Sequence, residues 1–170
     1  SFDNAIIEKH GAQVFAFDPT PKSINWIENQ QLSPSCHFFG YGIDQKTGFV
    51  NFNLPKNQDH VSGSVVKHQN VNEENSISVP MKSLADIIKE LGHSHIDVLK
   101  MDIEGSEYAV IDSILAAPVR IDQILLELHE RFFTDGKAKT AKLLKTLKEH
   151  GYVIYAVSDT FEEISFIKRT

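Results

Sequence analysis

The sequence predicts a layered α/β fold with a mostly parallel β-sheet whose last strand runs antiparallel. Short apolar runs alternate with amphipathic stretches of helical period along most of the chain, which is the order expected of parallel strands joined by helices. The run at Ile121–Leu128 is so apolar that both of its faces must be covered, as in a parallel sheet. Two runs at the end of the chain, Tyr152–Val157 and Glu163–Lys168, flank a short turn and predict an antiparallel pair.

The first part of the chain predicts a helix, a strand and a second helix. Phe2–His10 carries apolar residues on one face, and Gly11 after it is a helix stop. Gln13–Phe17 is interpreted as a buried strand. Thr20 is expected to cap the next helix, because its hydroxyl can accept a backbone N–H there, and Pro21 suits the first turn.

The middle of the chain predicts three further strands and a long polar connection. The strands are expected at His37–Tyr41, Gly48–Leu54 and Ile77–Val79. Lys56–Asn75 contains no Leu, Ile or aromatic residue. We therefore expect this stretch to be a loop over a site.

The second half predicts regular alternation of helices and strands. Ser83 caps a helix, and Asp86 three residues on completes a signature of the capping-box kind. The elements expected after it are Ile96–Met101, Glu107–Leu115, Ile121–Leu128 and Lys137–His150. In the last of these helices we expect Ala141, Leu144 and Leu147 to face inward.

The composition predicts one globular domain, residues 1–170, of ordinary polarity. Of the 170 residues, 41% are hydrophobic and 24% charged, which is the balance of a protein with its own core. The net charge of −6 disfavours a nucleic-acid partner, because proteins that bind the phosphate backbone are basic. No apolar run is long enough to cross a bilayer, and the single cysteine, Cys36, excludes an internal disulfide. We expect a cytoplasmic domain that binds neither nucleic acid nor a membrane.

Asp18 is the first candidate for a binding residue, because ligands of such sheets bind at the carboxyl ends of the strands. It directly follows the apolar run Val14–Phe17. A carboxylate at this place can accept two hydrogen bonds from the neighbouring hydroxyls of a ribose. An Asp ahead of Pro19 can equally serve as a turn or helix-capping residue, and both interpretations remain open.

The stretch I-D-V-L-K-M-D-I-E-G-S-E, residues 96–107, is the most informative one. A buried strand ends in Asp102, and Glu104 stands two residues on, so both carboxylates can face one cleft. Gly105 permits a tight turn or a close backbone approach. We interpret Asp102 and Glu104 as functional. Glu107 is interpreted as an acid that complements the start of the following helix.

Glu127 and His129 end the next strand, and alternation along a strand places both on one face. His129 is a candidate general base for a substrate hydroxyl, because the pKa of an imidazole lies near neutrality. Two alternatives remain open. Asp102, Glu127 and His129 could bind a divalent metal, or Glu127 and His129 could pair only to order the strand end. Our prediction for these residues includes no bound metal.

These residues resemble the FkbM-type methyltransferase family, whose hallmark is a K-x-D-x-E-G-x-E segment. Here the hallmark reads Lys100, Asp102, Glu104, Gly105 and Glu107. Other stretches extend the resemblance over nearly the whole chain: F-D-P-T-P (17–21), V-P-M-K-S-L-A-D-I-I (79–88), I-L-L-E-L-H (124–129) and E-I-S-F-I-K-R (163–169).

The resemblance implies a three-layer Rossmann-like methyltransferase sheet and an activity. The expected reaction is methyl transfer from S-adenosylmethionine to an acceptor, a hydroxyl oxygen of a sugar or other small metabolite. The expected partners are a small-molecule or glycan acceptor and a second copy of the chain in a homodimer. The alternative is a non-catalytic Rossmann-like module that no longer binds the cofactor.

The resemblance also implies roles for individual residues. Asp18 would hold the ribose of the cofactor, and Gly42 and Ile43 would sit beside the adenine. Asp102 would lie near the methionine ammonium or the substrate. The catalytic residues that would face the acceptor are Glu104, Glu127 and His129.

One expected feature of the family has no counterpart in the sequence. Methyltransferases of this class carry a first strand and a glycine-rich loop ahead of the first helix, and this chain starts in or just before that helix. We therefore expect the domain to be N-terminally incomplete. The missing strand would belong at the sheet centre, between the strands predicted at 13–17 and 96–101.

Overall fold

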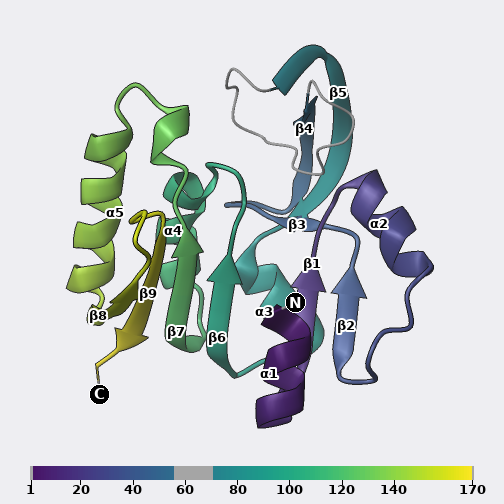
Figure 1. Cartoon of the computed structure of the whole chain (residues 1–170), viewed down its shortest axis with the longest axis horizontal. Helices are drawn as coiled ribbons and strands as arrows, with labels where there is room; N and C mark the ends of the chain where they lie inside the picture. Colours follow the sequence, from purple (N-terminus) through teal and green to yellow (C-terminus); the bar gives the residue numbers. More distant parts are fainter. Residues whose placement is uncertain (1, 56–70, 170) are drawn as a thin grey trace.

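A computed structural model of the chain describes residues 2–55 and 71–169 and shows a mixed α/β protein (Figure 1). Within these residues, helices and strands alternate over most of the chain, as predicted. The strands form three hydrogen-bonded sheets, with the orders β1–β2, β3–β5–β4 and β6–β7–β9–β8. The antiparallel last strand is therefore confirmed. The expected mostly parallel sheet is met only in part, because three of the six described strand pairs are antiparallel and hydrogen bonds do not join all described strands into one sheet.

The third sheet supplies many of the side chains of the main hydrophobic core. Strands β6 and β7 are parallel, and β9 runs antiparallel to both β7 and β8. The predicted antiparallel pairing of the two closing runs is therefore confirmed. The four strands are β6 (His95–Met101), β7 (Arg120–Glu127), β8 (Tyr152–Val157) and β9 (Glu163–Lys168).

The first sheet is a parallel pair of β1 (Val14–Phe17) and β2 (Cys36–Phe39). Its aromatic side chains stack on each other, with ring centroids 5.2 Å apart for Phe17 and Phe39. Phe15 also meets the ring of His93, just ahead of β6, at 4.5 Å. Among the described residues, β1 hydrogen-bonds only to β2, and β6 only to β7.

The second sheet corrects two sequence predictions. It consists of β3 (Gly42–Ile43), β4 (Gly48–Pro55) and β5 (Val71–Lys82). Strand β5 is much longer than the predicted Ile77–Val79, because its residues pair antiparallel with β4 as far as Pro55, the last residue of that strand. The loop prediction for Lys56–Asn75 is wrong for residues 71–75, which belong to β5, and its remainder lies outside the described residues.

The first three helices begin and end close to where the local signals place them. Helix α2 starts after Thr20, whose hydroxyl accepts the N–H of Ser23. Helix α3 starts after Ser83, which accepts the N–H of Asp86, and ends at Gly92 in the left-handed conformation. The bounds are α1 (Phe2–His10), α2 (Pro21–Glu28) and α3 (Leu84–Leu91). In Figure 1, α1 lies in front of the strands and α3 behind them.

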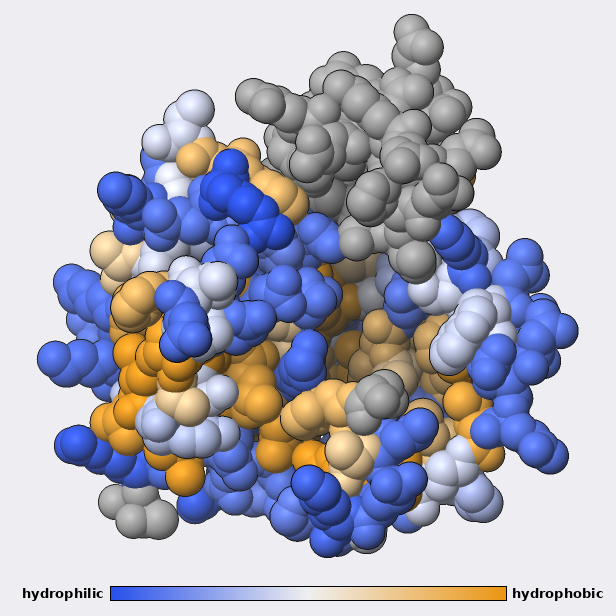
Figure 2. Space-filling view, viewed as in Figure 1, coloured by the Kyte–Doolittle hydropathy of each residue, from blue (hydrophilic) through white to orange (hydrophobic). Residues whose placement is uncertain are grey.

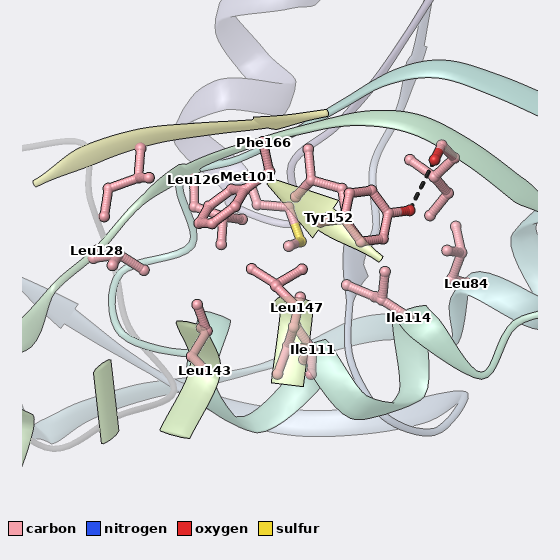
Figure 3. Close-up of a cluster of buried hydrophobic side chains, with 14 of the residues drawn as sticks. Leu84, Met101, Ile111, Ile114, Leu126, Leu128, Leu143, Leu147, Tyr152 and Phe166 are labelled. Atoms are coloured by element: carbon pink, nitrogen blue, oxygen red, sulfur yellow. Dashed lines mark hydrogen bonds between the residues drawn. The ribbon is translucent and has the colours of Figure 1, made fainter. Parts of the chain in front are cut away.

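Helices α4 (Glu107–Leu115) and α5 (Gly136–Glu149) cover one face of the third sheet, and a short 3₁₀ helix, η1 (Glu130–Phe132), leads into α5. Figure 3 shows side chains from both helices packed against the strands. The buried residues of this core include Ile111, Ile114, Leu126, Leu143, Leu147, Tyr152 and Phe166. The predicted inward face of α5 is partly wrong, because Leu143 is buried whereas Ala141 is exposed.

The surface carries apolar side chains along the edge of the third sheet. Figure 2 shows hydrophobic residues gathered toward the left of the view, in the region of β8 and β9. The large apolar residues exposed on these two strands are Ile154, Tyr155, Val157 and Ile167. Among the residues that the structure describes, no helix combines the length and apolar character needed to cross a membrane.

Candidate active site

The candidate site lies where β6 and β7 end next to each other. The two strands are parallel, and Met101 at the end of β6 pairs with Leu126 near the end of β7. Asp102 follows β6 directly, and His129 lies two residues beyond the end of β7. The N–H of Leu128 donates to the carbonyl of Glu162 at 2.8 Å. This bond fixes the path by which the chain leaves β7, and with it the start of the His129 segment.

A turn with unusual backbone geometry carries the acidic residues after β6. Glu104 has a φ of 53°, and Gly105 has a φ of 95°. A left-handed conformation is uncommon for a residue with a side chain, and such strain often occurs at functional sites. A Cβ on Gly105 would lie 3.3 Å from the ring of Phe132 and 3.4 Å from that of Phe133. The glycine therefore lets the aromatic residues after His129 pack closely against the turn.

Glu107 connects this turn to His129. Its side chain has no exposed surface, and His129 is exposed by only 1%. Oε1 of Glu107 accepts the N–H of Ile103 at 2.9 Å and lies 3.1 Å from Nδ1 of His129. An ionised Glu107 can only accept, so Nδ1 of His129 carries the hydrogen of this contact. Glu107 thereby sets the orientation of the imidazole ring.

The other ring nitrogen of His129 faces two further carboxylates. Nε2 lies 3.7 Å from Oδ1 of Asp102 and 3.5 Å from Oε2 of Glu104. Burial lowers the pKa of His129, but the hydrogen bond and charge of Glu107, together with the charges of Glu104 and Asp102, outweigh it, so the pKa is raised. Asp102 and Glu104 meet at one place, as their spacing in the sequence predicts.

Glu127 is the remaining carboxyl group of the site. Burial raises its pKa, and the nearby negative charge of Asp102 raises it further. Across the sheet it pairs with Glu163 of β9. The site thus gathers Asp102, Glu104, Glu127 and His129, and the structure brings together all the residues that were predicted to face the acceptor.

The other three predicted cofactor residues lie away from β6 and β7, at the end of β1 and in β3. Asp18 follows β1, where its Oδ1 accepts the N–H of Thr20 at 2.8 Å and the hydroxyl of Thr20 at 2.6 Å. Gly42 in β3 is buried, and a Cβ on it would lie 2.7 Å from the sulfur of Met81. Ile43 packs against the main core. The turn role of Asp18 is therefore observed, and its contact with a ribose stays a prediction.

Glu107 is the residue whose importance the sequence interpretation missed. It does begin α4, as predicted, but its carboxylate points into the protein toward His129 rather than only complementing the helix start. Its Oε2 is buried and has no hydrogen-bond partner among the residues that the structure describes. Glu107 is the last residue of the K-x-D-x-E-G-x-E segment. Its place in this segment was the sequence signal that could have indicated its importance.

Two groups of side chains in the described part of the chain have the spacing of metal ligands. One is Asp102, Glu104 and His129, and the other is His95, Asp97 and Asp122 at the opposite end of β6 and β7. In each group the potential ligand atoms all lie within 4.8 Å of one another.

Comparison with known proteins identifies the family. Residues 3–154 match the family described as the methyltransferase FkbM domain. The chain is 28% identical over 123 residues to a human protein named probable methyltransferase-like protein 24, covering 71% of this chain and 27% of that protein. It is 31% identical over 114 residues to the 2-O-methyltransferase NoeI of Sinorhizobium fredii, covering 59% of this chain and 46% of that enzyme.

The chain thus spans less than half the length of these two relatives, and no solved structure matches it significantly. The family match covers most of the 170 residues and includes the whole turn that carries Asp102, Glu104 and Glu107. The chain therefore belongs to the FkbM methyltransferase family.

Proposed function

We propose that the chain is the catalytic domain of an enzyme that transfers a methyl group from S-adenosylmethionine to a hydroxyl oxygen of a sugar or other small metabolite. The observation that carries the proposal is the convergence of Asp102, Glu104, Glu127 and His129 at the carboxyl ends of two parallel strands. Ligands of α/β sheets bind at that edge. The name of the bacterial relative, a 2-O-methyltransferase, supports oxygen as the acceptor atom.

We infer a three-layer Rossmann-like arrangement from the way the elements lie. Both β1–β2 and β6–β7 are parallel pairs, and α1 lies on the opposite side of the strands from α3 and α4 (Figure 1). Right-handed connections between parallel strands place helices on the faces of such a sheet. This arrangement supports binding of a nucleoside cofactor across the strand ends.

The residues present fit S-adenosylmethionine by charge and by position. The cofactor carries positive charge on its sulfonium and its ammonium group, and the edge formed by Asp102, Glu104 and Glu127 is acidic. Opposite charges attract strongly where one partner is partly buried. Asp18 is held by Thr20 at the end of β1, where a carboxylate can accept ribose hydroxyls, and Gly42 and Ile43 follow as the adenine-side residues.

When bound, S-adenosylmethionine supplies an activated methyl group: the acceptor oxygen bonds to the methyl carbon as the carbon–sulfur electron pair passes to sulfur. The products are a methyl ether and S-adenosylhomocysteine. The residues of this chain align the acceptor and take the hydroxyl proton. Alignment dominates the rate of such a transfer, and Glu104, Glu127 and His129 are the groups placed to accept the proton.

Calorimetry with S-adenosylmethionine, combined with an assay for released S-adenosylhomocysteine, tests the proposal. The protein at its natural length is incubated with a panel of sugars and small hydroxylated metabolites. We expect saturable cofactor binding and product release with at least one acceptor class. Absence of cofactor binding would instead support a non-catalytic module, and binding with transfer only to nitrogen or carbon acceptors would exclude O-methylation.

A further inference from the structure

His129 has the surroundings of a metal ligand. The ring is buried, and its Nδ1 is engaged by Glu107, so Nε2 is the only nitrogen left for another partner. A metal-binding histidine commonly donates its second ring N–H to a carboxylate, which fixes the tautomer and aims the free nitrogen at the ion. The contact between Glu107 and Nδ1 of His129 has this form.

The distances around Nε2 suit a shared ion better than direct hydrogen bonds. Oδ1 of Asp102 and Oε2 of Glu104 lie 3.7 Å and 3.5 Å from Nε2, which is longer than the usual hydrogen-bond range of about 2.7–3.2 Å. Ligand atoms at about 2.1 Å from an ion in tetrahedral geometry stand about 3.4 Å apart. The two distances from Nε2 of His129 are therefore close to the separation that a common ion would require, and all three potential ligand atoms lie within 4.8 Å of one another.

The charge balance points in the same direction. Asp102, Glu104 and Glu107 place three carboxylates around one imidazole, and Glu127 lies beside Asp102. Glu107 is buried, whereas the side chains of Glu104 and Asp102 are 23% and 42% exposed. Carboxylates gathered this closely repel one another, and a cation between them removes that repulsion. A protonated imidazole compensates only one negative charge, whereas a divalent cation bound to a neutral imidazole compensates two.

The second cluster with metal-like spacing serves as a contrast. Asp122 is already engaged by Arg120, whose Nε lies 2.7 Å from Oδ1, and the Asp97 side chain is 92% exposed. The guanidinium of Arg120 would repel a cation bound to Asp122. The exposed carboxylate of Asp97 would have to give up bound water to bind a cation, for little gain in free energy. Both clusters satisfy the same spacing limit of 4.8 Å, but the imidazole of His129 is buried whereas that of His95 is 39% exposed, and Arg120 already binds one carboxylate of the second cluster.

We propose that Asp102, Glu104 and His129 bind one divalent transition-metal cation, with Glu107 as the positioning residue for His129. One imidazole nitrogen and two carboxylate oxygens favour Mn²⁺ or Zn²⁺ over Ca²⁺. Three protein ligands leave coordination positions open, as in catalytic metal sites.

The role of the cation rests on the proposed function. An acceptor hydroxyl at an open position would lose its proton more readily, because a bound cation stabilises the alkoxide. With His129 and Glu104 engaged by the ion, Glu127 is the predicted catalytic residue left to take that proton. Metal binding itself does not depend on this role.

Titration with Mn²⁺, followed by electron paramagnetic resonance, tests the site on the natural-length protein after removal of bound metals with a chelator. We expect one Mn²⁺ per chain, displaced by Zn²⁺. Asp102→Asn, Glu104→Gln and His129→Gln should each weaken binding by about tenfold or more, and Glu107→Gln by about 10- to 100-fold, the range seen when outer partners of metal ligands are changed. Asp97→Asn and Asp122→Asn are the matched controls and should leave binding unchanged.

The outcomes separate the proposal from the proposed function. No stoichiometric binding, or binding lost in Asp122→Asn but kept in Asp102→Asn and Glu104→Gln, would overturn the metal site. Stoichiometric binding that is lost in Asp102→Asn and Glu104→Gln supports it, even if no acceptor is methylated, in which case only the proposed function fails. Circular dichroism of each variant reports folding, and the two turn variants, at partly exposed positions, remain informative if Glu107→Gln does not fold.

Discussion

Glu107 and His129 form a contact between two ionisable side chains inside the protein. Both side chains are buried, and a buried carboxylate without partners costs several kcal/mol. The N–H of Ile103 and the ring of His129 supply those partners on Oε1. This pair ties the turn after β6 to the segment after β7. An interaction between residues 22 positions apart in the sequence is therefore one of the contacts that set the geometry of the site.

Asp102 is the residue whose replacement should report most directly on activity. Asp102→Asn removes the charge at the end of β6 without changing the size of the side chain, and loss of a charge-assisted bond costs about 1.5–3 kcal/mol. We expect turnover or cofactor affinity to fall by more than about tenfold, since every 1.4 kcal/mol is tenfold. The measurement is steady-state kinetics alongside calorimetry with S-adenosylmethionine.

Asp97→Asn is the control for this prediction, because Asp97 is an exposed acid on the same strand. The thermal unfolding midpoint of both variants should match that of the parent protein. Kinetics of Asp102→Asn equal to those of the control would mean that Asp102 serves only the local structure.

Gly136 is required at the start of α5 because the backbone of Glu130 leaves no space for a side chain there. A Cβ there would lie 2.2 Å from the carbonyl oxygen of Glu130 and 2.9 Å from its carbonyl carbon. Backbone atoms cannot move aside as a flexible side chain can. Gly136→Ala should therefore lower the free energy of unfolding by about 1–3 kcal/mol, the usual cost of overpacking, as measured by urea denaturation.

Gly48→Ala is the matched change, because a Cβ on Gly48 meets nothing within 4 Å. We expect its stability to equal or slightly exceed that of the parent, since alanine loses less backbone entropy on folding. Equal stability of the two variants would show that η1 shifts freely and that the contact with Glu130 carries no strain.

At the scale of elements, the faces of helices are decided by what packs on them. Helix α5 buries Leu143 and Leu147 against the third sheet and α4 (Figure 3), whereas Ala141 is exposed. Its five lysines are spread through the helix, and no strong apolar stripe marks the inward face. The rotation of such a helix follows from its contacts rather than from its own pattern.

Leu143→Ala tests this assignment of the inward face. Removing the buried side chain should cost about 2–5 kcal/mol, as for other large-to-small changes in cores. Ala141 lies two residues before Leu143 and is exposed. Ala141→Gln should therefore change the free energy of unfolding by less than about 0.5 kcal/mol. Chemical denaturation of both variants measures the difference, and a larger loss in Ala141→Gln would restore the inward face predicted from the sequence.

At the scale of the whole molecule, the described strands leave two edges unpaired near the candidate site. Strand β1 bonds on one side to β2 and β6 on one side to β7, although Phe15 of β1 meets His93 just ahead of β6. Unpaired strand edges invite a further strand. The expectation of a missing central strand stays a prediction, and these edges are where such a strand would pair.

A longer version of the chain tests that prediction. We expect a version with about 30 to 40 further residues ahead of Ser1, the length of a strand and loop in a βαβ unit, to bind S-adenosylmethionine about a hundredfold more tightly. Two or three backbone hydrogen bonds from such a loop contribute about 2–4 kcal/mol in total, and every 1.4 kcal/mol is tenfold in affinity. Side-by-side calorimetry of the two versions decides it, and equal affinities would show that the cofactor site is independent of those residues.

Local signals in the sequence were sufficient for most element boundaries and for part of the site. The caps at Thr20 and Ser83 involve neighbours within three residues, so a short window contains the whole interaction. The bounds of α1 and α4 match the predicted ranges, and the pairing of the closing strands follows from the short turn between two apolar runs. The acidic pair Asp102 and Glu104 is likewise visible in five residues of sequence.

Only the tertiary structure decided the features that depend on distant partners. The length of β5 is set by its pairing with β4 across the chain, and the burial of Leu143 by α4 and the sheet. Glu107 reads as a helix-start acid until the fold brings His129 to it. The sequence segment marked Glu107 but not its contact with His129, for a physical reason: burial and charge pairing are properties of the space around a side chain, and residues far along the chain fill that space.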